Sequence, residues 1–172
     1  MRLKMKQKSF EKLVNNLEVM TKQYRLLLDC VRKEKELLIQ SDIEKLNESN
    51  ILKEQILSKI KDVEAPRIIC ASQLAQIVGA NQDEPRLLEI AQKIGGAEGD
   101  RLRNIHATLE LLIKRLVEIN KDNAIYAESA LNVVNSAMNN IKESLMGQKT
   151  YQKKGNYQQG YDKSGHLVSK EA

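Results

Sequence analysis

The chain has 172 residues, a net charge of +5 and 3% aromatic residues, with no Trp and a single Phe. This length predicts one domain, and the abundance of Leu, Ile, Lys, Glu, Asn and Gln is typical of long amphipathic helices around a thin core. Charged residues interrupt the apolar stretch after Phe10, so the sequence predicts neither a signal peptide nor direct membrane insertion. We therefore expect a cytoplasmic protein.

The positive charge is concentrated at the two ends of the sequence. Four basic residues lie among the first eight, and five Lys follow Met146 against only Asp162 and Glu171, so the helices between are nearly neutral. No basic stripe follows a helix face, so we do not predict nucleic-acid binding. The charge indicates solubility or loose electrostatic docking.

The sequence offers little for catalysis or metal binding. Cys30 and Cys70 form no CxxC pair, and His106 and His166 are the only imidazoles, so a zinc site is not predicted. We interpret both thiols as small buried apolar groups, and His106 as a half-exposed helix residue. Sequence motifs of hydrolases, metalloproteases, calcium loops and phosphate loops are missing, so we predict no enzyme and no cofactor.

The first half of the chain predicts a helical hairpin. Apolar residues alternate at gaps of three and four from Phe10 to Val31, which predicts a helix from about Met5 to Ile39. Ser41 is then placed to cap a second helix, with Glu44 completing a capping box, and this helix extends to about Val63. Because the connection is short, the two helices should be antiparallel.

The middle of the chain is punctuated by Pro and Gly. Pro66 predicts the first turn of a short helix over residues 67–78, which Gly79 ends. A loop over residues 81–84 and a second short helix over residues 86–94 follow. The Gly residues at 95, 96 and 99 predict a helix stop and a flexible turn, because no strand precedes them as a phosphate-binding loop requires.

A long final helix over Leu102–Leu145 is the strongest pattern in the sequence. One apolar seam comprises Leu102, Ile105, Leu109, Leu112, Leu116, Ile119, Asn123, Tyr126, Ala130, Val133, Ala137 and Ile141. A second, offset set comprises Ile113, Val117, Ile125, Leu131, Val134, Met138 and Leu145. A single neighbour cannot cover both sets, so this helix needs more than one partner.

After Met146 the composition changes abruptly to Gly, Gln, Lys and Tyr. We expect residues 147–172 to form a disordered tail, in which three Tyr residues are either incidental or anchors of a docking motif. The predicted fold is therefore all-α, with a helical bundle domain over residues 1–146 and a flexible tail over residues 147–172. The domain combines long antiparallel helices in a coiled-coil-like bundle with short middle helices.

The second half of the final helix carries more apolar surface than the shorter helices can cover. Its small or flexible residues are Ala124, Ala127, Ala130, Val133, Val134, Ala137, Met138, Ile141 and Leu145. Such a surface indicates a protein interaction site, and a partner's amphipathic helix could bind along it. The pattern is equally compatible with a self-paired coiled coil, which would make the protein a homo-oligomeric structural scaffold.

The segment from Leu112 to Gly155 resembles the FlgN family of flagellar export chaperones. The resemblance rests on Leu116, Asn120 and Asn123 in the pattern L-x-x-x-N-x-x-N, and on Thr150, Tyr151 and Gly155 in the pattern T-Y-x-x-x-G. Gln152 follows Tyr151 where many relatives have Gly. The layout of a long first helix, hairpin, variable middle, long last helix and tail is similar over nearly the whole chain.

This resemblance implies a cytoplasmic chaperone for type III export of flagellar proteins. It would bind the C-terminal helices of hook-associated proteins, which form the hook-filament junction, prevent their premature assembly and deliver them to the export gate. In similar chaperones the tail Tyr contacts the cytosolic domain of the gate, which points to Tyr151, with Gly155, as the docking site here.

The cargo-binding residues expected from these arguments lie on the final helix. They are Asn120, Asn123, Ala127, Ala130, Leu131, Val134, Ala137, Met138, Ile141 and Leu145. Asn123 has a second interpretation, because a single buried amide in an apolar seam commonly fixes the register of packed helices. Both readings stay open at this point, either a register residue or an amide that binds the cargo backbone.

Overall fold

The computed structural model describes residues 2–146, apart from the side chains of residues 2, 3, 143, 145 and 146. Within this range the chain forms four α-helices and no strand, which confirms the all-α prediction. The helices are α1 (Arg2–Gln40), α2 (Ile43–Val78), α3 (Leu87–Ile94) and α4 (Gly96–Met146). Contacts between residues divide the chain into two compact units, Met1–Ala124 and Ile125–Ala172, called the first and second units below.

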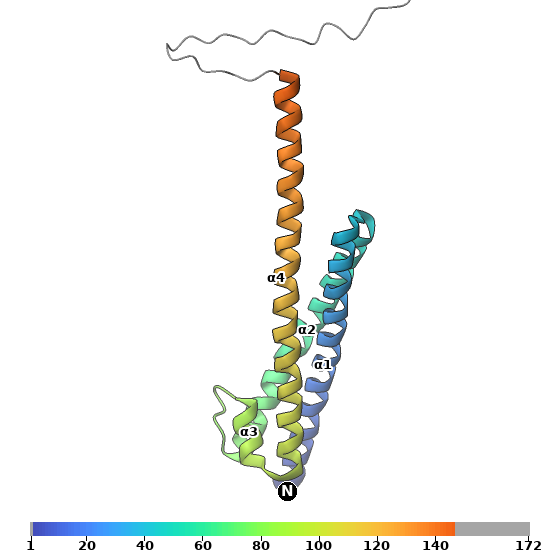
Figure 1. Cartoon of the computed structure of the whole chain (residues 1–172). Helices are drawn as coiled ribbons and strands as arrows, with labels where there is room; N and C mark the ends of the chain where they lie inside the picture. Colours follow the sequence, from blue (N-terminus) through green and yellow to red (C-terminus); the bar gives the residue numbers. More distant parts are fainter. Residues whose placement is uncertain (1, 147–172) are drawn as a thin grey trace, which may run out of the picture. The chain divides into compact units, whose positions relative to one another are not determined.

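α1 and α2 form the predicted hairpin and run side by side (Figure 1). The cap of α2 differs from the prediction by one residue. Ser41 has a φ of 57° and belongs to the turn, whereas Asp42 is the N-cap and its side chain accepts a hydrogen bond from the Lys45 backbone N–H at 3.1 Å. A second hydrogen bond, from the Lys45 ammonium, lowers the pKa of the Asp42 carboxyl. Asp is as good a cap as Ser, so the two adjacent candidates could not be separated from sequence.

The predicted helix boundary at Pro66 is wrong, because α2 continues through Pro66 to Val78. Pro costs a helix one hydrogen bond and a steric clash, but packing can outweigh that cost. The apolar phase of α2 is unbroken, since Ile56, Ile60, Val63, Cys70 and Leu74 stay in step across the Pro and are all at least partly buried. Gly79 ends the helix as predicted, with a left-handed φ of 75° and its N–H bonded to the Ala75 carbonyl.

The Gly residues after α3 do not form the flexible turn that was predicted. Gly95 caps α3 with a φ of 65°, and α4 begins immediately at Gly96, so the connection is a single residue. Gly99 lies inside the first turns of α4, where an added Cβ would overlap the backbone carbonyl oxygen of Ala91. The small residue at 99 therefore allows α4 to pack directly on α3.

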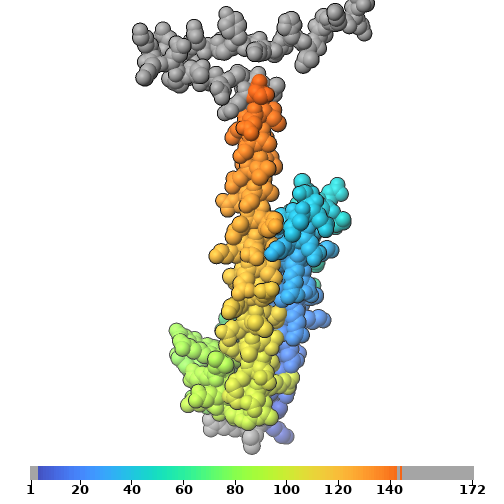
Figure 2. Space-filling view, viewed as in Figure 1, coloured from blue at the N-terminus to red at the C-terminus, as the bar shows by residue number. Residues whose placement is uncertain are grey.

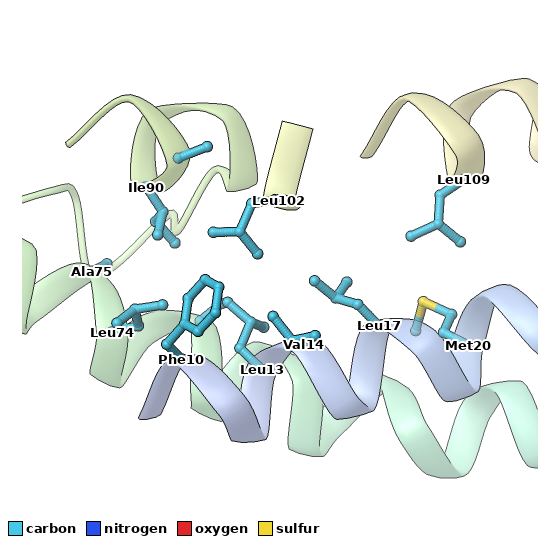
Figure 3. Close-up of a cluster of buried hydrophobic side chains, with 12 residues drawn as sticks. Phe10, Leu13, Val14, Leu17, Met20, Leu74, Ala75, Ile90, Leu102 and Leu109 are labelled. Atoms are coloured by element: carbon cyan, nitrogen blue, oxygen red, sulfur yellow. The ribbon is translucent and has the colours of Figure 1, made fainter. Parts of the chain in front are cut away.

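The core of the first unit contains two apolar clusters. The first core cluster combines Phe10, Leu13, Val14, Leu17 and Met20 of α1 with Ala71, Leu74 and Ala75 of α2, Ile90 and Ala91 of α3, and Leu102 and Leu109 of α4. Figure 3 shows these side chains pointing into one interior from all four helices. The second core cluster combines Leu27, Leu28, Cys30 and Val31 of α1 with Ile56 and Ile60 of α2, and Leu116 and Ile119 of α4. In the space-filling view the blue surface of α1 lies directly against the yellow part of α4 (Figure 2).

The predictions for the isolated Cys and His residues are mostly confirmed. Cys30 is buried, and its thiol lies 3.4 Å from the Ser49 carbonyl oxygen. Cys70 was predicted to be buried but is only partly buried, and its sulfur accepts a hydrogen bond from the Asn16 amide. His106 is half-buried on α4 and lies 3.8 Å from Glu110.

Candidate functional site

The apolar seam of α4 is buried in the first unit. Leu102, Leu109, Leu116 and Ile119 lie in the core, and Ile105 and Leu112 are partly buried beside them. The next row on the same helix is mostly open to solvent. We call this the open row; its members alternate at gaps of four and three and are Ile113, Val117, Asn120, Ala124, Ala127, Leu131, Val134, Met138 and Ile141.

In the second unit, every side chain of α4 that the structure describes is exposed. Leu131 is 59% exposed, Met138 is 62% exposed and Ile141 is 58% exposed. The segment is also a weak helix former, since its polar positions are mostly Asn and Ser and its charged residues are Glu128, Lys142 and Glu143. A helix of this length and composition has marginal stability in water on its own. Its exposed apolar face is therefore a candidate protein-binding surface.

The sequence-predicted cargo residues fall into three groups. Seven are exposed on the second unit: Ala127, Ala130, Leu131, Val134, Ala137, Met138 and Ile141. Asn120 is exposed on the first unit, whereas Asn123 is buried there with 3% of its surface accessible. The side chain of Leu145, together with Tyr151 and Gly155, lies outside the described residues.

Asn123 belongs to a polar layer that joins three helices at the end of the second core cluster. Its Nδ2 donates to the Val31 carbonyl oxygen at 2.9 Å and lies 3.4 Å from Glu34 Oε2. The other Glu34 oxygen accepts a hydrogen bond from Lys53 Nζ of α2 at 2.8 Å. Asn123 Oδ1 is buried without a hydrogen-bond partner. Rotating the amide would turn this oxygen toward two other acceptors, so the orientation with Nδ2 toward α1 is the favourable one.

A groove of about 300 Å³ opens in the first unit where α1, α2 and α4 meet. Its lining residues are Tyr24, Leu27 and Val31 of α1, Lys53 and Leu57 of α2, and Ile113, Leu116, Val117 and Asn120 of α4. The lining is mostly apolar, and Tyr24, Lys53 and Asn120 are its residues with polar side-chain groups. Leu57 and Val117 are 47% and 63% exposed, so both stand on the rim.

A second, larger hollow of about 580 Å³ lies between α1 and the start of α4. Its walls carry mixed charge, including Glu18, Lys22, Arg25 and Arg101. Arg101 donates to Glu18 at 2.7 Å, and this bond raises the pKa of its guanidinium further above the ordinary value. Because its walls combine basic and acidic side chains, this hollow does not indicate one ligand class.

Three polar residues, Tyr24 of α1 and Glu64 and Arg67 of α2, interact with one another. Arg67 donates two hydrogen bonds to Glu64, at 2.6 and 3.1 Å, which lowers the pKa of the Glu64 carboxyl. Burial, with a smaller contribution from Glu64, raises the pKa of Tyr24. Of these three residues, Tyr24 lines the groove.

A comparison with protein-family models identifies the family of this chain. The family model for FlgN protein matches residues 1–159. The chain belongs to the FlgN family. Searches of curated proteins and of solved structures return no match.

FlgN proteins form a family of flagellar export chaperones, not a family of enzymes. Within residues 2–146, no set of three or more His, Cys, Asp or Glu side chains is arranged to hold a metal ion. None of the helices described here combines the length and apolarity needed to cross a bilayer. What the FlgN surface does offer is apolar area on α4 and the groove beside it.

The groove residues on α1 and α2 were missed at the sequence level. Tyr24, Leu27 and Val31 belong to the apolar row of α1, and their spacing predicts only that they are covered. Ile113 and Val117 were recognised as part of an offset apolar set but not as site residues. Their continuation into Asn120, Ala127 and Leu131 at alternating gaps was the signal that could have identified the whole open row.

Proposed function

We propose that this FlgN protein binds the C-terminal amphipathic helices of hook-associated junction proteins along the open row of α4, in the bacterial cytoplasm. The observation that carries the proposal is the second unit, where each described side chain of α4 is exposed although one face is apolar. A cargo helix laid on that face hides apolar surface on both partners and so opposes premature self-assembly of the cargo.

The size of the open row sets the strength of this contact. Leu131, Val134, Met138 and Ile141 are each more than half exposed. Burying the exposed part of these side chains against a cargo helix contributes roughly 1 kcal/mol per side chain, or about 4 kcal/mol together. A micromolar complex requires about 8 kcal/mol net of ordering costs, so the second unit supplies only part of the affinity.

The test is a titration of the full chain against a fluorescent peptide that copies the C-terminal helix of a junction protein. A Leu131→Lys, Met138→Lys double variant places two charges on the open row, and we expect roughly tenfold or greater loss of affinity. The matched control is Asn132→Lys, Asn139→Lys, which adds the same charges with the same spacing on the other face. Equal affinity of both double variants would remove the open row from cargo binding.

The competing structural function, a self-dimerising coiled coil, predicts a different result in sedimentation. If the protein is a chaperone, we expect one chain to bind one peptide, and we expect the peptide to dissociate any dimer of the chain. A tight dimer that ignores the peptide would support the scaffold instead.

We propose further that Tyr151 and Gly155 dock the loaded chaperone on the cytosolic domain of the export gate. The support is that the FlgN match extends through residue 159 and so includes both residues. Removing residues 147–172 is expected to leave peptide affinity unchanged and to weaken binding to the gate domain, and Tyr151→Ala should reproduce that loss. If the truncation abolishes peptide binding, the tail belongs to the cargo site.

A further inference from the structure

α3 shows what kind of segment fits between α2 and α4. It is a helix of eight residues, Leu87–Ile94, with Ile90 and Ala91 fully buried in the first core cluster. Its neighbours there are Leu74 and Ala75 of α2 and Leu102 of α4. At this level the bundle therefore has four helices, and the fourth is only two turns long.

The groove lies between α1, α2 and α4, further along these helices than α3 and on the side of the bundle that α3 covers. On α4, Gly99 packs on α3, and His106, Ile113 and Asn120 follow at heptad spacing, so all four lie on one face. Ile113 and Asn120 line the groove.

The other two helices repeat the relation. On α2, Ala71 of the first core cluster is followed at heptad spacing by Glu64 and by Leu57 of the groove. On α1, Leu17 of the same cluster leads by the same spacing to Tyr24 and then Val31 of the groove. The bundle thus has three helices around the groove. At the level of the first core cluster, on the other side of Tyr24 and Glu64, α3 is the fourth helix.

The dimensions of the groove fix the length of the missing segment. Ile113 to Asn120 spans one heptad, which is about 10 Å of helix. The wall is apolar between Tyr24 at one end and Lys53 with Asn120 at the other. A segment that fits has apolar residues at i, i+3 or i+4, and i+7, with polar residues on either side.

We propose that the groove receives one heptad of an amphipathic helix from the exported protein, which completes a four-helix arrangement as α3 does beyond Tyr24. This inference rests on the proposed chaperone function and adds the α1 and α2 walls of the groove to the contact that the open row makes with cargo. The chain's own tail is a poor occupant, because residues 147–172 contain only Leu167 and Val168 as large aliphatic side chains. A heptad of apolar anchors cannot be built from them.

The test introduces a charge on the groove rim and compares it with a charge elsewhere on the same helix. Val117→Lys is expected to weaken binding of the junction-protein peptide to the full chain roughly tenfold or more. The matched control is Leu111→Lys, since Leu111 is 69% exposed and lies on the opposite face of α4. This control should bind the peptide within about twofold of the parent chain, as surface changes outside an interface do.

A second variant reports on the groove directly. The chain contains no Trp, so Leu57→Trp places a single indole on the α2 rim. Saturation with a peptide that lacks Trp should shift its emission to the blue, because the indole leaves water. Unchanged emission at saturation would overturn the groove as a contact site.

The outcomes separate this inference from the function on which it rests. If the parent chain does not bind the peptide, the proposed function fails. If Val117→Lys binds as well as Leu111→Lys while the Leu131, Met138 double variant loses binding, the function stands and the groove proposal is wrong. If Val117→Lys disrupts self-association and leaves peptide binding intact, the occupant is a second copy, which also overturns the proposal.

Discussion

Replacing Asn123 with Leu tests whether the buried amide fixes helix register at a cost in stability. The amide makes one good hydrogen bond, from Nδ2 to the Val31 carbonyl at 2.9 Å, and a long one to Glu34 at 3.4 Å. Val31 and Glu34 keep other partners when the amide is lost, since the Val31 carbonyl lies within α1 and Glu34 retains Lys53 at 2.8 Å. The substitution therefore leaves no new buried group without a partner.

The magnitude follows from three contributions. Losing the donor bonds costs about 1 kcal/mol, whereas removing the unpartnered, buried Oδ1 recovers about 1–3 kcal/mol. Leu has nearly the same shape as Asn and adds apolar burial beside Ile119, worth about 1 kcal/mol more. We expect Asn123→Leu to raise the free energy of unfolding by about 2 kcal/mol, because the gains exceed the loss.

The assay is urea unfolding followed by circular dichroism, with Asn120→Leu as the control. Asn120 lies three residues earlier and is exposed, so its substitution should change stability by less than about 0.5 kcal/mol. Peptide binding by Asn123→Leu should be retained. If the variant is less stable than the parent chain, the Val31 bond outweighs the unpartnered oxygen and the reasoning is refuted.

Three further predictions concern the fold. Gly99→Ala should destabilise the chain by about 1–2 kcal/mol in urea unfolding, because overlap with the Ala91 carbonyl outweighs the better helix propensity of Ala; a gain in stability would contradict this packing. Pro66→Ala should stabilise by about 1–2 kcal/mol in the same assay, since α2 regains a backbone hydrogen bond, and a loss would show that Pro66 is needed for the path of α2. The hydrogen bond from Arg67 lowers the pKa of Glu64 below 4.5, so the stabilisation by the Glu64–Arg67 pair is present above that pH and is lost as the pH falls further. Glu64→Gln should therefore flatten the dependence of unfolding free energy on pH below 4.5. An unchanged pH dependence would show that the Glu64–Arg67 pair does not contribute to stability.

The sequence was most informative where periodicity and packing coincide. The alternating gaps of α1 and of the first half of α4 identified residues that the structure buries, such as Leu17 and Leu116. Gly79 and Gly95 were correctly read as helix ends, because a positive φ strongly favours Gly. In these places local preference and tertiary packing favour the same structure.

The errors occurred where a local signal competed with packing. Pro66 is a strong local breaker, yet the apolar phase of α2 continues across it and packing prevails. Gly96 and Gly99 resemble a flexible loop in sequence, but both lie in α4, and residue 99 is Gly because the Ala91 backbone leaves no space for a side chain there. Close approach of two helices is a property of three-dimensional packing and leaves no periodic trace.

Some residues of the candidate site could be predicted from the sequence, and others could be recognised only in the structure. Leu131 and Met138 were found from spacing, because an apolar stripe without a visible partner can be seen in one helix. The groove needs three helices at once, and residues such as Leu57 become part of a site only when α1, α2 and α4 are brought together. The burial of Asn123 was predicted from its place in the apolar seam, whereas its bond to the Val31 carbonyl required the structure.

Hydrogen exchange of the full chain with and without the junction-protein peptide tests the central claim most directly. In the free protein, amides of residues 125–146 should exchange rapidly, because every described side chain there is exposed and the segment is a weak helix former. Amides around Leu13 and Leu17 should be protected in both states. Saturating peptide should slow exchange over residues 125–146, whereas unchanged exchange there at full saturation would show that the cargo helix binds elsewhere.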